Sequence, residues 1–258
     1  MTAWNPQRYL QFSRERELPC RDLIRRIAET PLETVVDLGC GPGNSTAVIK
    51  EAFPQAEVIG VDSSPEMLAA AKARLPGVQF VQVDIQSWAC AQPVDLIFSN
   101  AALQWVADHG ALLPRLVSML KPGGYLAVQM PYRDEDSPIS RVFRAAEVSD
   151  RWKAYFEKPV RTWSVQQPSD YYRWLCQSCS QIDLWLTDYY HALPHARAVI
   201  DWYRGTGLRP YLDALPSDRE RKAFLQYCGD TIEPMYPVQS DGCILFSIRR
   251  FFFTARQR

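Results

Sequence analysis

The first half of the chain alternates short apolar runs with helical patterns. Residues 78–85 alternate apolar and polar positions with period two, as a half-buried strand does. A helix is expected from Ala111 to Leu120, because the following Lys121-Pro122-Gly123-Gly124 is a strong helix-stop signal. Strands that alternate with helices in this way predict a doubly wound parallel sheet. We expect five such strands, at residues 34–36, 58–62, 78–85, 94–100 and 125–131.

The second half has a different pattern. Residues 132–180 combine charge, proline and aromatic side chains and predict helices over the sheet. Residues 181–191 and 243–254 alternate like two further strands, and residues 194–236 between them are helical in pattern. The expected fold class is therefore α/β: a doubly wound, mostly parallel, seven-stranded, Rossmann-like sheet with a helical cap inserted between the last two strands.

The segment from Asp37 to Thr46, Asp-Leu-Gly-Cys-Gly-Pro-Gly-Asn-Ser-Thr, follows the first apolar run and leads into a helical pattern. This arrangement lets a small molecule approach the backbone at the carboxyl end of a parallel strand, and glycine permits both the approach and a positive φ. A dinucleotide would place its pyrophosphate beside Asp37, which would repel it, and would favour glycine in place of Asn44. Asp37 instead suits a ligand that carries an ammonium group. The alternative is a tight turn with a chance aspartate.

The segment resembles the first motif of class I S-adenosylmethionine-dependent methyltransferases. The resemblance implies that Asp37 lies near the methionine ammonium group of this cofactor. It also implies that Gly39, Cys40, Gly41 and Asn44 contribute to the same cofactor site.

An acid ends the second expected strand. Asp62 stands 25 positions after Asp37, near the ~20-residue spacing of an acid that binds ribose hydroxyls in nucleotide-binding α/β folds. Ser63 follows it, and Met67 lies in the first turn of the next helix, where it could pack against an adenine ring. Alone, Asp62 would be an ordinary loop acid; its distance from the glycine turn favours the functional role.

The ends of the third and fourth expected strands supply further candidates. In class I methyltransferases, which the chain resembles, an acid at the end of the third strand binds the adenine amino group, and the next residue offers its backbone amide to the ring. The resemblance implies these roles for Asp84 and Ile85. Asp84 could equally be a helix N-cap, and both interpretations stay open. Asn100 ends the fourth strand at the edge that faces the ligand crevice, and Gln104 and Trp105 follow it.

Composition narrows the classes of function. The 258 residues are 47% hydrophobic, enough for a full core, and a formal net charge of zero argues against nucleic acid as the main partner. We expect no membrane partner, because the chain lacks both a signal-peptide pattern and an apolar run of about 18 residues. Seven scattered cysteines predict reduced thiols in the cytoplasm, with Cys176 and Cys179 as packing residues and no metal site.

From end to end, the chain resembles the trans-aconitate 2-methyltransferases. It departs from their pattern at Tyr132–Asp136, which replaces a more neutral stretch, and at Arg249, where proline is usual. The segments that carry the resemblance include Trp4–Pro6, Asp37–Thr46, Gly60–Pro65, Asn100–Trp105, Leu126–Pro131, Tyr189–His191, Ile200–Trp202 and Thr206–Pro210.

The resemblance implies methyl transfer from S-adenosylmethionine to a carboxylate of trans-aconitate, giving a monomethyl ester and S-adenosylhomocysteine. A carboxylate is already ionised at neutral pH, so no catalytic base is expected. A tricarboxylate cannot be buried unpaired, and arginine is its expected partner. The resemblance implies that Arg209 and Arg250 bind the substrate. Further substrate-binding candidates follow from position: His191 at the end of a strand beside the cap, and Gln104 and Trp105 at the crevice.

Both arginines have alternative roles. Arg209 precedes a proline and could cap a helix, and Arg250 could stack on the phenylalanines that follow it. On a strand, Arg249 and Arg250 point to opposite faces, so both cannot line one pocket.

The expected organisation is a single methyltransferase domain over residues 1–258, acting as a monomer on a small tricarboxylate. Within it we expect an N-terminal lid at residues 1–30, a cofactor-binding core at residues 31–131 and a helical substrate cap at residues 194–236. Tyr9, Phe12 and Arg16 are the lid residues expected to close over the cofactor.

Three other functions remain open. The enzyme could methylate another small acid or a hydroxyl acceptor. A nicotinamide-dependent oxidoreductase is disfavoured by Asp37 and Asn44. A binding module without turnover is disfavoured by the acids at positions 37, 62 and 84.

Overall fold

The computed structural model describes residues 13–27, 31–157, 160 and 163–258. The chain forms two compact units. One, which we call the sheet unit, comprises Arg16–Tyr132, Trp163–Thr187 and Arg250–Arg258. The other, which we call the helical unit, comprises Arg133–Thr162 and Asp188–Arg249 with the described residues before Arg16.

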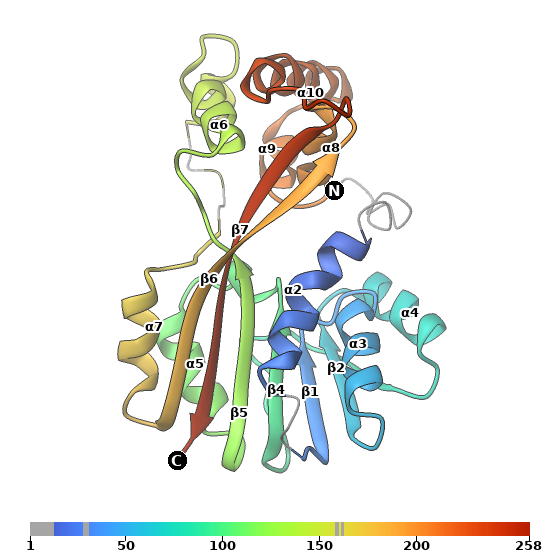
Figure 1. The fold of residues 1–258 in the computed structure, drawn as a ribbon, viewed down its shortest axis with the longest axis vertical. Helices are drawn as coiled ribbons and strands as arrows, with labels where there is room; N and C mark the ends of the chain where they lie inside the picture. Colours follow the sequence, from blue (N-terminus) through green and yellow to red (C-terminus); the bar gives the residue numbers. More distant parts are fainter. Residues whose placement is uncertain (1–12, 28–30, 158–159, 161–162) are drawn as a thin grey trace. The chain divides into compact units, whose positions relative to one another are not determined.

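Seven strands of the described chain form one sheet in the order β3-β2-β1-β4-β5-β7-β6 (Figure 1). Strands β1 to β5 pair in parallel, and β5 pairs with β7 antiparallel. The predicted α/β, mostly parallel, seven-stranded fold is confirmed. The strands are β1 (Thr34–Leu38), β2 (Glu57–Asp62), β3 (Gln79–Gln82), β4 (Val94–Asn100), β5 (Leu120–Pro131), β6 (Cys179–Leu193) and β7 (Ile244–Gln257).

The helices connect these strands, and α8 to α10 lie in the sequence between β6 and β7, as predicted for the insertion. Serine caps and proline first turns begin α4 and α6, because a serine oxygen accepts an otherwise unpaired amide and proline needs no donor there. The described helices are α2 (Ser13–Arg25), α3 (Asn44–Ala52), α4 (Pro65–Arg74), α5 (His109–Val117), α6 (Pro138–Val148), α7 (Pro168–Leu175), α8 (Arg197–Arg204), α9 (Arg209–Ala214) and α10 (Asp218–Ile232).

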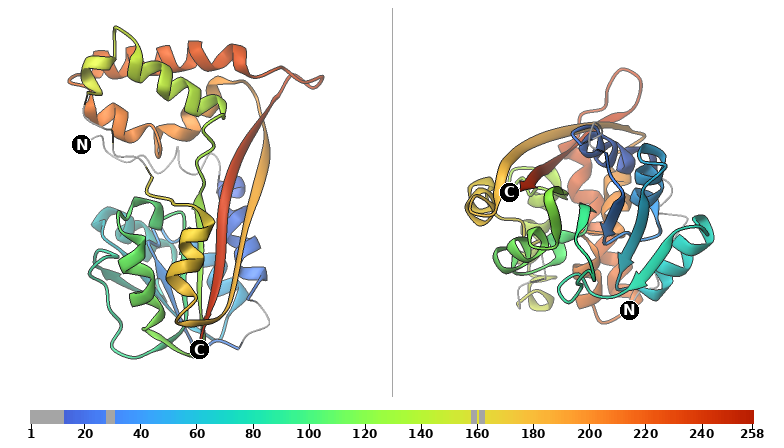
Figure 2. Two further views of the ribbon diagram at one scale, coloured as in Figure 1. Left: turned by 90° about the vertical axis from the view of Figure 1, so that its left-hand side faces the viewer. Right: turned by 90° about the horizontal axis from the view of Figure 1, so that it is seen from below.

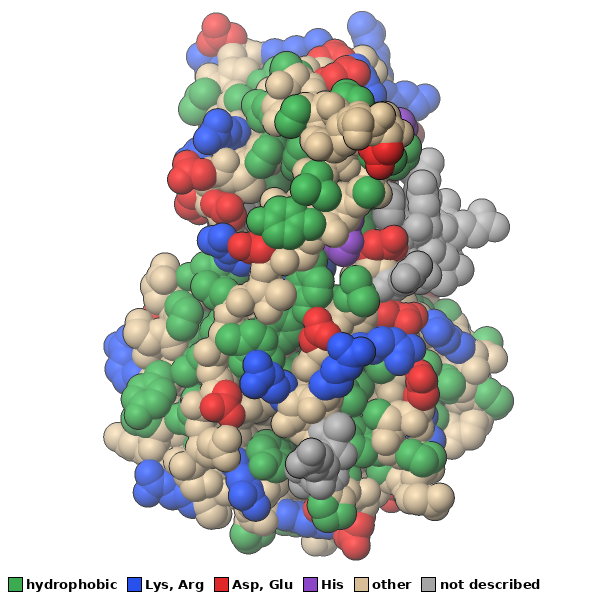
Figure 3. Space-filling view, in the orientation of Figure 1, with side chains coloured by type: hydrophobic (Ala, Val, Ile, Leu, Met, Phe, Trp, Pro, Cys, Tyr) green, Lys and Arg blue, Asp and Glu red, His purple; other side chains and the backbone are tan. Residues whose placement is uncertain are grey.

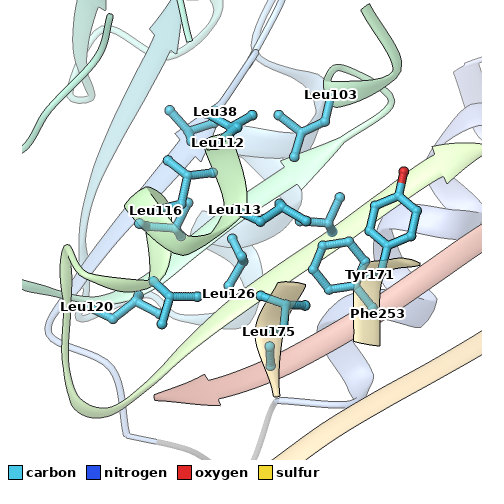
Figure 4. Packing of buried hydrophobic residues seen from close by; sticks show 14 of the residues in the cluster. Leu38, Leu103, Leu112, Leu113, Leu116, Leu120, Leu126, Tyr171, Leu175 and Phe253 are labelled. Carbon is cyan, nitrogen blue, oxygen red and sulfur yellow. The ribbon is translucent and has the colours of Figure 1, made fainter. Parts of the chain in front are cut away.

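The core of the sheet unit lies between the sheet and the pair α5 and α7, and Figure 2 shows α2 and α3 on the opposite side of the sheet. Each large apolar side chain buried in this way stabilises the fold by about 1.5–3 kcal/mol. Figure 4 shows the packing, which includes Leu112, Leu113 and Leu116 of α5, Tyr171 and Leu175 of α7, Leu126 of β5 and Phe253 of β7.

Two predicted boundaries are wrong. The helix expected to reach Leu120 ends at Val117, and Lys121–Gly124 lies inside β5. Leu120 pairs with Val94 of β4 across a register shift, and Gly123 supplies the positive φ of 77° that this irregular start of the strand requires. The third strand ends at Gln82, before Asp84. The boundary was wrong because the alternation of apolar and polar residues continues to Ile85, beyond the last residue of β3 that pairs with β2.

The helical unit has an aromatic core of its own. The rings of Trp152 and Phe224, both fully buried, lie 5.2 Å apart in an edge-to-face arrangement. Tyr211 packs in the same cluster, and its hydroxyl donates to Glu147 Oε1 at 2.6 Å. Figure 2 shows α6 beside α10, which closes this core.

The surface and the cysteines show little further specialisation. Lysine and arginine side chains are interspersed with acidic ones on the face shown in Figure 3. In the part of the chain that the structure describes, no helix is long and apolar enough to cross a membrane, and no three His, Cys, Asp or Glu side chains gather as a metal site. All seven cysteines are free thiols.

Candidate functional site

The glycine turn after β1 requires its glycines. Gly39 has a φ of 76°, and a Cβ on it would lie 2.2 Å from the Cβ of Ala102. The amides of Gly39 and Cys40 both donate to the carbonyl of Val61, at 2.7 and 3.0 Å, which ties the turn to β2. Gly43 then caps α3 in the left-handed conformation. A side chain at Gly39 would therefore displace both the turn and the segment after β4.

Asp37 lies directly beneath this turn and is fully buried. Its Oδ2 accepts hydrogen bonds from the hydroxyls of Ser45 and Thr46, each at 2.7 Å, whereas its Oδ1 has no partner among the described residues. Burial raises the pKa of Asp37 from 3.8 to about 6, the two hydroxyls lower the pKa, and the charge of Asp62 raises it further. The carboxylate thus has one acceptor atom available to a positively charged ligand group.

Asp62, at the end of β2, holds two backbone segments together. One carboxylate oxygen accepts from Gly41 N and the other from Ser64 N, both at 2.9 Å. Each oxygen retains a further lone pair, so the pair can still accept two hydroxyl groups side by side. Ser63 next to it is exposed, and Met67 is partly buried in the first turn of α4.

The segment after β3 forms a turn in which Asp84 is exposed. Asp84 Oδ1 accepts from Gln86 N at 2.8 Å, so this acid caps a turn and not an α-helix. Arg115 of α5 donates to the carbonyl oxygens of Ile85, at 3.0 Å, and Trp88. Arg115 therefore holds the segment that carries two predicted cofactor residues. Sequence reasoning missed it, because a helix arginine offers no local signal of such a contact.

The segment after β4 has an unusual backbone. Ala101 has a φ of 55°, a left-handed conformation that alanine rarely adopts, and its amide donates to Gln129 O at 2.9 Å. Gln104 is buried, and its Nε2 donates to Ala101 O at 2.8 Å. Trp105 is partly buried in the 3₁₀ turn Leu103–Trp105. The left-handed Ala101 therefore links the end of β4 at Asn100 to the turn that carries Gln104 and Trp105.

Two predicted cofactor residues have side chains with other partners. The thiol of Cys40 is buried, with only 3% of the residue exposed, and lies close to Gly60. The side-chain oxygen of Asn44, the first residue of α3, accepts from Arg74. Because the Cys40 amide donates to Val61 O, only its carbonyl, which already accepts from Gly43 N, has backbone capacity left for a ligand.

Several buried polar atoms of the sheet unit have no hydrogen-bond partner within the described part of the chain. An unpaired buried polar group costs about 1–3 kcal/mol, so each calls for an explanation. Gln129 of β5 is among them, and sequence reasoning missed it; its only signal was a polar residue in an otherwise apolar run. Four of the atoms are Asp37 Oδ1, Asn100 Oδ1, Gln104 Oε1 and Gln129 Nε2, and a fifth, Gln257 Oε1, lies at the end of β7.

The remaining predicted residues are divided between the two units. Arg250 is buried in the sheet unit, on β7 opposite Pro131. Its neighbour Arg249 points the other way, as predicted, and forms a bidentate ion pair with Asp188 at 2.7 and 2.9 Å. His191 and Arg209 belong to the helical unit.

Within the helical unit, His191 is buried and stacks on Trp202 with ring centroids 5.2 Å apart. Arg209 is the first residue of α9 and lies 3.7 Å from Asp213. Its side chain is 45% exposed, so it is accessible to an anion.

The N-terminal lid prediction falls largely outside the described residues. Tyr9 and Phe12 are not described, nor is the side chain of Arg16. The described part of the segment is α2, whose Cys20 and Leu23 are buried in the sheet unit.

Known proteins resemble this chain over part or nearly all of its length. Residues 35–124 match a family described as a methyltransferase domain. The chain is 46% identical over 255 residues to a curated trans-aconitate 2-methyltransferase of Azoarcus sp. (strain BH72), covering 99% of each chain. It is 42% identical over 257 residues to the protein of the same name from Escherichia coli, covering 100% of this chain and 99% of that one.

Solved structures share the fold at lower identity. The YcgJ protein of Bacillus subtilis aligns with a TM-score of 0.60 and 18% identity, covering 93% of this chain and 98% of that one. A phosphoethanolamine N-methyltransferase of Haemonchus contortus, in complex with S-adenosylhomocysteine, aligns with a TM-score of 0.58 and 17% identity, covering 93% of this chain and 53% of that one.

Proposed function

The chain belongs to the trans-aconitate 2-methyltransferase family, and from this membership we propose that it transfers the methyl group of S-adenosylmethionine to a carboxylate of trans-aconitate. The products are a monomethyl ester and S-adenosylhomocysteine. The observation that carries the proposal is the 42–46% identity to curated relatives over nearly the whole chain.

The residues of the sheet unit fit the cofactor. Bound S-adenosylmethionine supplies an electrophilic methyl group on a positively charged sulfur. Asp37 Oδ1, buried and without a partner among the described residues, matches the ammonium group of the methionine end. The remaining lone pairs of Asp62 match the two ribose hydroxyls, and Asp84 with the Ile85 amide matches the adenine edge.

The acceptor carboxylate needs no general base, because it is ionised at neutral pH. The opposite charges of carboxylate and sulfonium disappear as the methyl group moves, so a site that excludes water favours the reaction. The protein's contribution is then in-line positioning of the two reactants.

Positive side chains must compensate the other acceptor carboxylates. We assign this role to Arg209 and Arg250, since an arginine clamped on the attacking carboxylate would reduce its nucleophilicity. His191, Gln104 and Trp105 are assigned contacts with the acceptor. The helical segment 194–236 is proposed as the substrate cap.

The free thiols suit a cytoplasmic protein. We also propose that the protein is a monomer, which size-exclusion chromatography with light scattering tests.

The test is methyl transfer from labelled S-adenosylmethionine to a panel of small carboxylic acids and hydroxyl compounds. We expect transfer to trans-aconitate, with the monomethyl ester identified by mass spectrometry. Transfer to another acid only would assign a different acceptor, and the divergent Tyr132–Asp136 segment would then be the first place to look. Tight binding of S-adenosylhomocysteine with no transfer would indicate a module without turnover.

A further inference from the structure

Three polar residues, two of them buried and Asn100 partly buried, lie near the carboxyl ends of the neighbouring strands β1, β4 and β5, which Figure 1 shows side by side. Asn100 and Gln129 are register partners in the parallel pair β4 and β5, so their side chains point to the same side. Asp37 is the register partner of Phe98, two residues before Asn100, and therefore shares that side. Asp37 is fully buried, and Gln129 is 1% exposed.

Each of these side chains has a buried polar atom without a partner in the described chain. Two of the atoms, Asp37 Oδ1 and Asn100 Oδ1, are acceptors, and the third, Gln129 Nε2, is a donor. Buried polar atoms are nearly always hydrogen-bonded in folded proteins, so three unpaired atoms on one face of neighbouring strands point to a bound molecule. The single donor selects an acceptor group of that molecule.

The fold itself does not require the amide of Gln129. The backbone carbonyl of Gln129 already accepts from Ala101 N at 2.9 Å, and its strand pairs with β4 and β7 through the main chain. The residues on either side, Val128 and Met130, are fully buried apolar side chains of the core. A polar side chain at position 129 is thus an exception, and its Nε2 donor is not used by any partner among the described residues.

We propose that Gln129 Nε2 donates a hydrogen bond to a carboxylate of a bound ligand. The inference rests on the proposed function, which brings two carboxylate-bearing molecules to this edge of the sheet: the amino acid end of S-adenosylmethionine and the tricarboxylate acceptor. A neutral amide holds a carboxylate without neutralising its charge, unlike arginine, so it can orient even the reacting carboxylate and leave it nucleophilic.

The experiment compares full-length Gln129→Met and Gln129→Glu with the wild type. Gln79→Met is the matched control, since Gln79 is an exposed glutamine at the start of β3 in the same sheet. Calorimetric titrations use S-adenosylmethionine and its decarboxylated form, which differ only in the carboxylate. Steady-state kinetics with trans-aconitate cover the acceptor.

If the cofactor carboxylate is bound, Gln129→Met weakens S-adenosylmethionine at least tenfold and the decarboxylated form less than twofold. If the acceptor carboxylate is bound, kcat/KM for trans-aconitate falls at least tenfold while cofactor affinity changes less than twofold. In either case Gln129→Glu loses at least as much, because two carboxylates repel each other. Gln79→Met should match the wild type.

The inference is overturned if Gln129→Met changes neither ligand more than twofold, if it weakens both cofactor forms equally, or if Gln129→Glu binds more tightly. If the wild type binds both cofactor forms but methylates no acid, the proposed function fails and the titrations alone decide the Gln129 contact. Should a variant lose the wild-type circular dichroism spectrum, the Gln129 side-chain amide signal of the wild type, followed by NMR with the same two cofactor forms, replaces it. If the Gln129 amide signal responds equally to the two cofactor forms, a contact with the cofactor carboxylate is refuted. If the signal does not shift with trans-aconitate, a contact with the acceptor carboxylate is refuted.

Discussion

Replacing Asp37 by asparagine should stabilise the ligand-free protein and weaken cofactor binding. The carboxylate is fully buried, and its pKa is raised to about 6. Asparagine keeps the shape, and its Oδ1 can accept from the hydroxyls of Ser45 and Thr46 as the carboxylate oxygen does. The substitution therefore removes a buried charge without removing the local hydrogen bonds.

The magnitude follows from the difference between the pKa of Asp37 in the folded protein, about 6, and its ordinary value of 3.8. At about 1.4 kcal/mol per pKa unit, the raised pKa corresponds to about 3 kcal/mol. The folded state holds this proton more tightly than the unfolded chain, so its stability falls as the pH rises from about 4 to about 6. Above that range the full cost is present, and Asp37→Asn should remove most of it.

The assay is thermal unfolding without ligand at pH 5 and pH 8, with calorimetric titration of S-adenosylhomocysteine at pH 8. For a chain of this size, about 2–4 °C per kcal/mol predicts a Tm higher by about 6–12 °C at pH 8 and a smaller gain at pH 5. Losing a charge-assisted hydrogen bond should weaken binding about 10- to 100-fold. The control is Asp150→Asn, whose carboxylate is 97% exposed and should change stability by less than about 0.5 kcal/mol. An Asp37→Asn protein that is less stable at pH 8, or binds S-adenosylhomocysteine as well as the wild type, would refute this reasoning.

Three further substitutions test the site. Gly39→Ala should lower the free energy of unfolding in urea by more than about 2 kcal/mol, because its Cβ would clash with Ala102. The control Gly77→Ala, with open space around it, should change stability by less than about 0.5 kcal/mol, and equal effects would contradict the steric argument. Arg209→Ala should raise KM for the acceptor about tenfold and leave cofactor affinity nearly unchanged, and a large loss of cofactor binding would count against its role. Arg115→Met should weaken S-adenosylhomocysteine binding about 3- to 10-fold, because the segment after β3 loses the hydrogen bond from Arg115 to Ile85 O. Unchanged affinity would show that this segment keeps its conformation without Arg115.

Local sequence signals predicted the glycine turn after β1, and the structure confirms this turn. The glycine turn was found because a positive φ and a close backbone approach leave few residue choices, and Gly39 meets both conditions. The placement of Asp62 beside the turn was also expected, but its bonds to Gly41 N and Ser64 N were not. Those bonds depend on how two loops meet, which no spacing along the chain encodes.

What the amino-acid sequence determined by itself was the order of strands and helices, the glycine turn and the alternation that turns Arg249 and Arg250 to opposite faces. These properties depend on neighbours within a few residues, so a pattern can reveal them. Only the tertiary structure decided which polar atoms are buried without a partner, because burial and hydrogen bonding arise between strands that are distant in the chain. Gln129 is the clearest case: its significance comes from Asn100 on the adjacent strand, 29 positions earlier in the sequence.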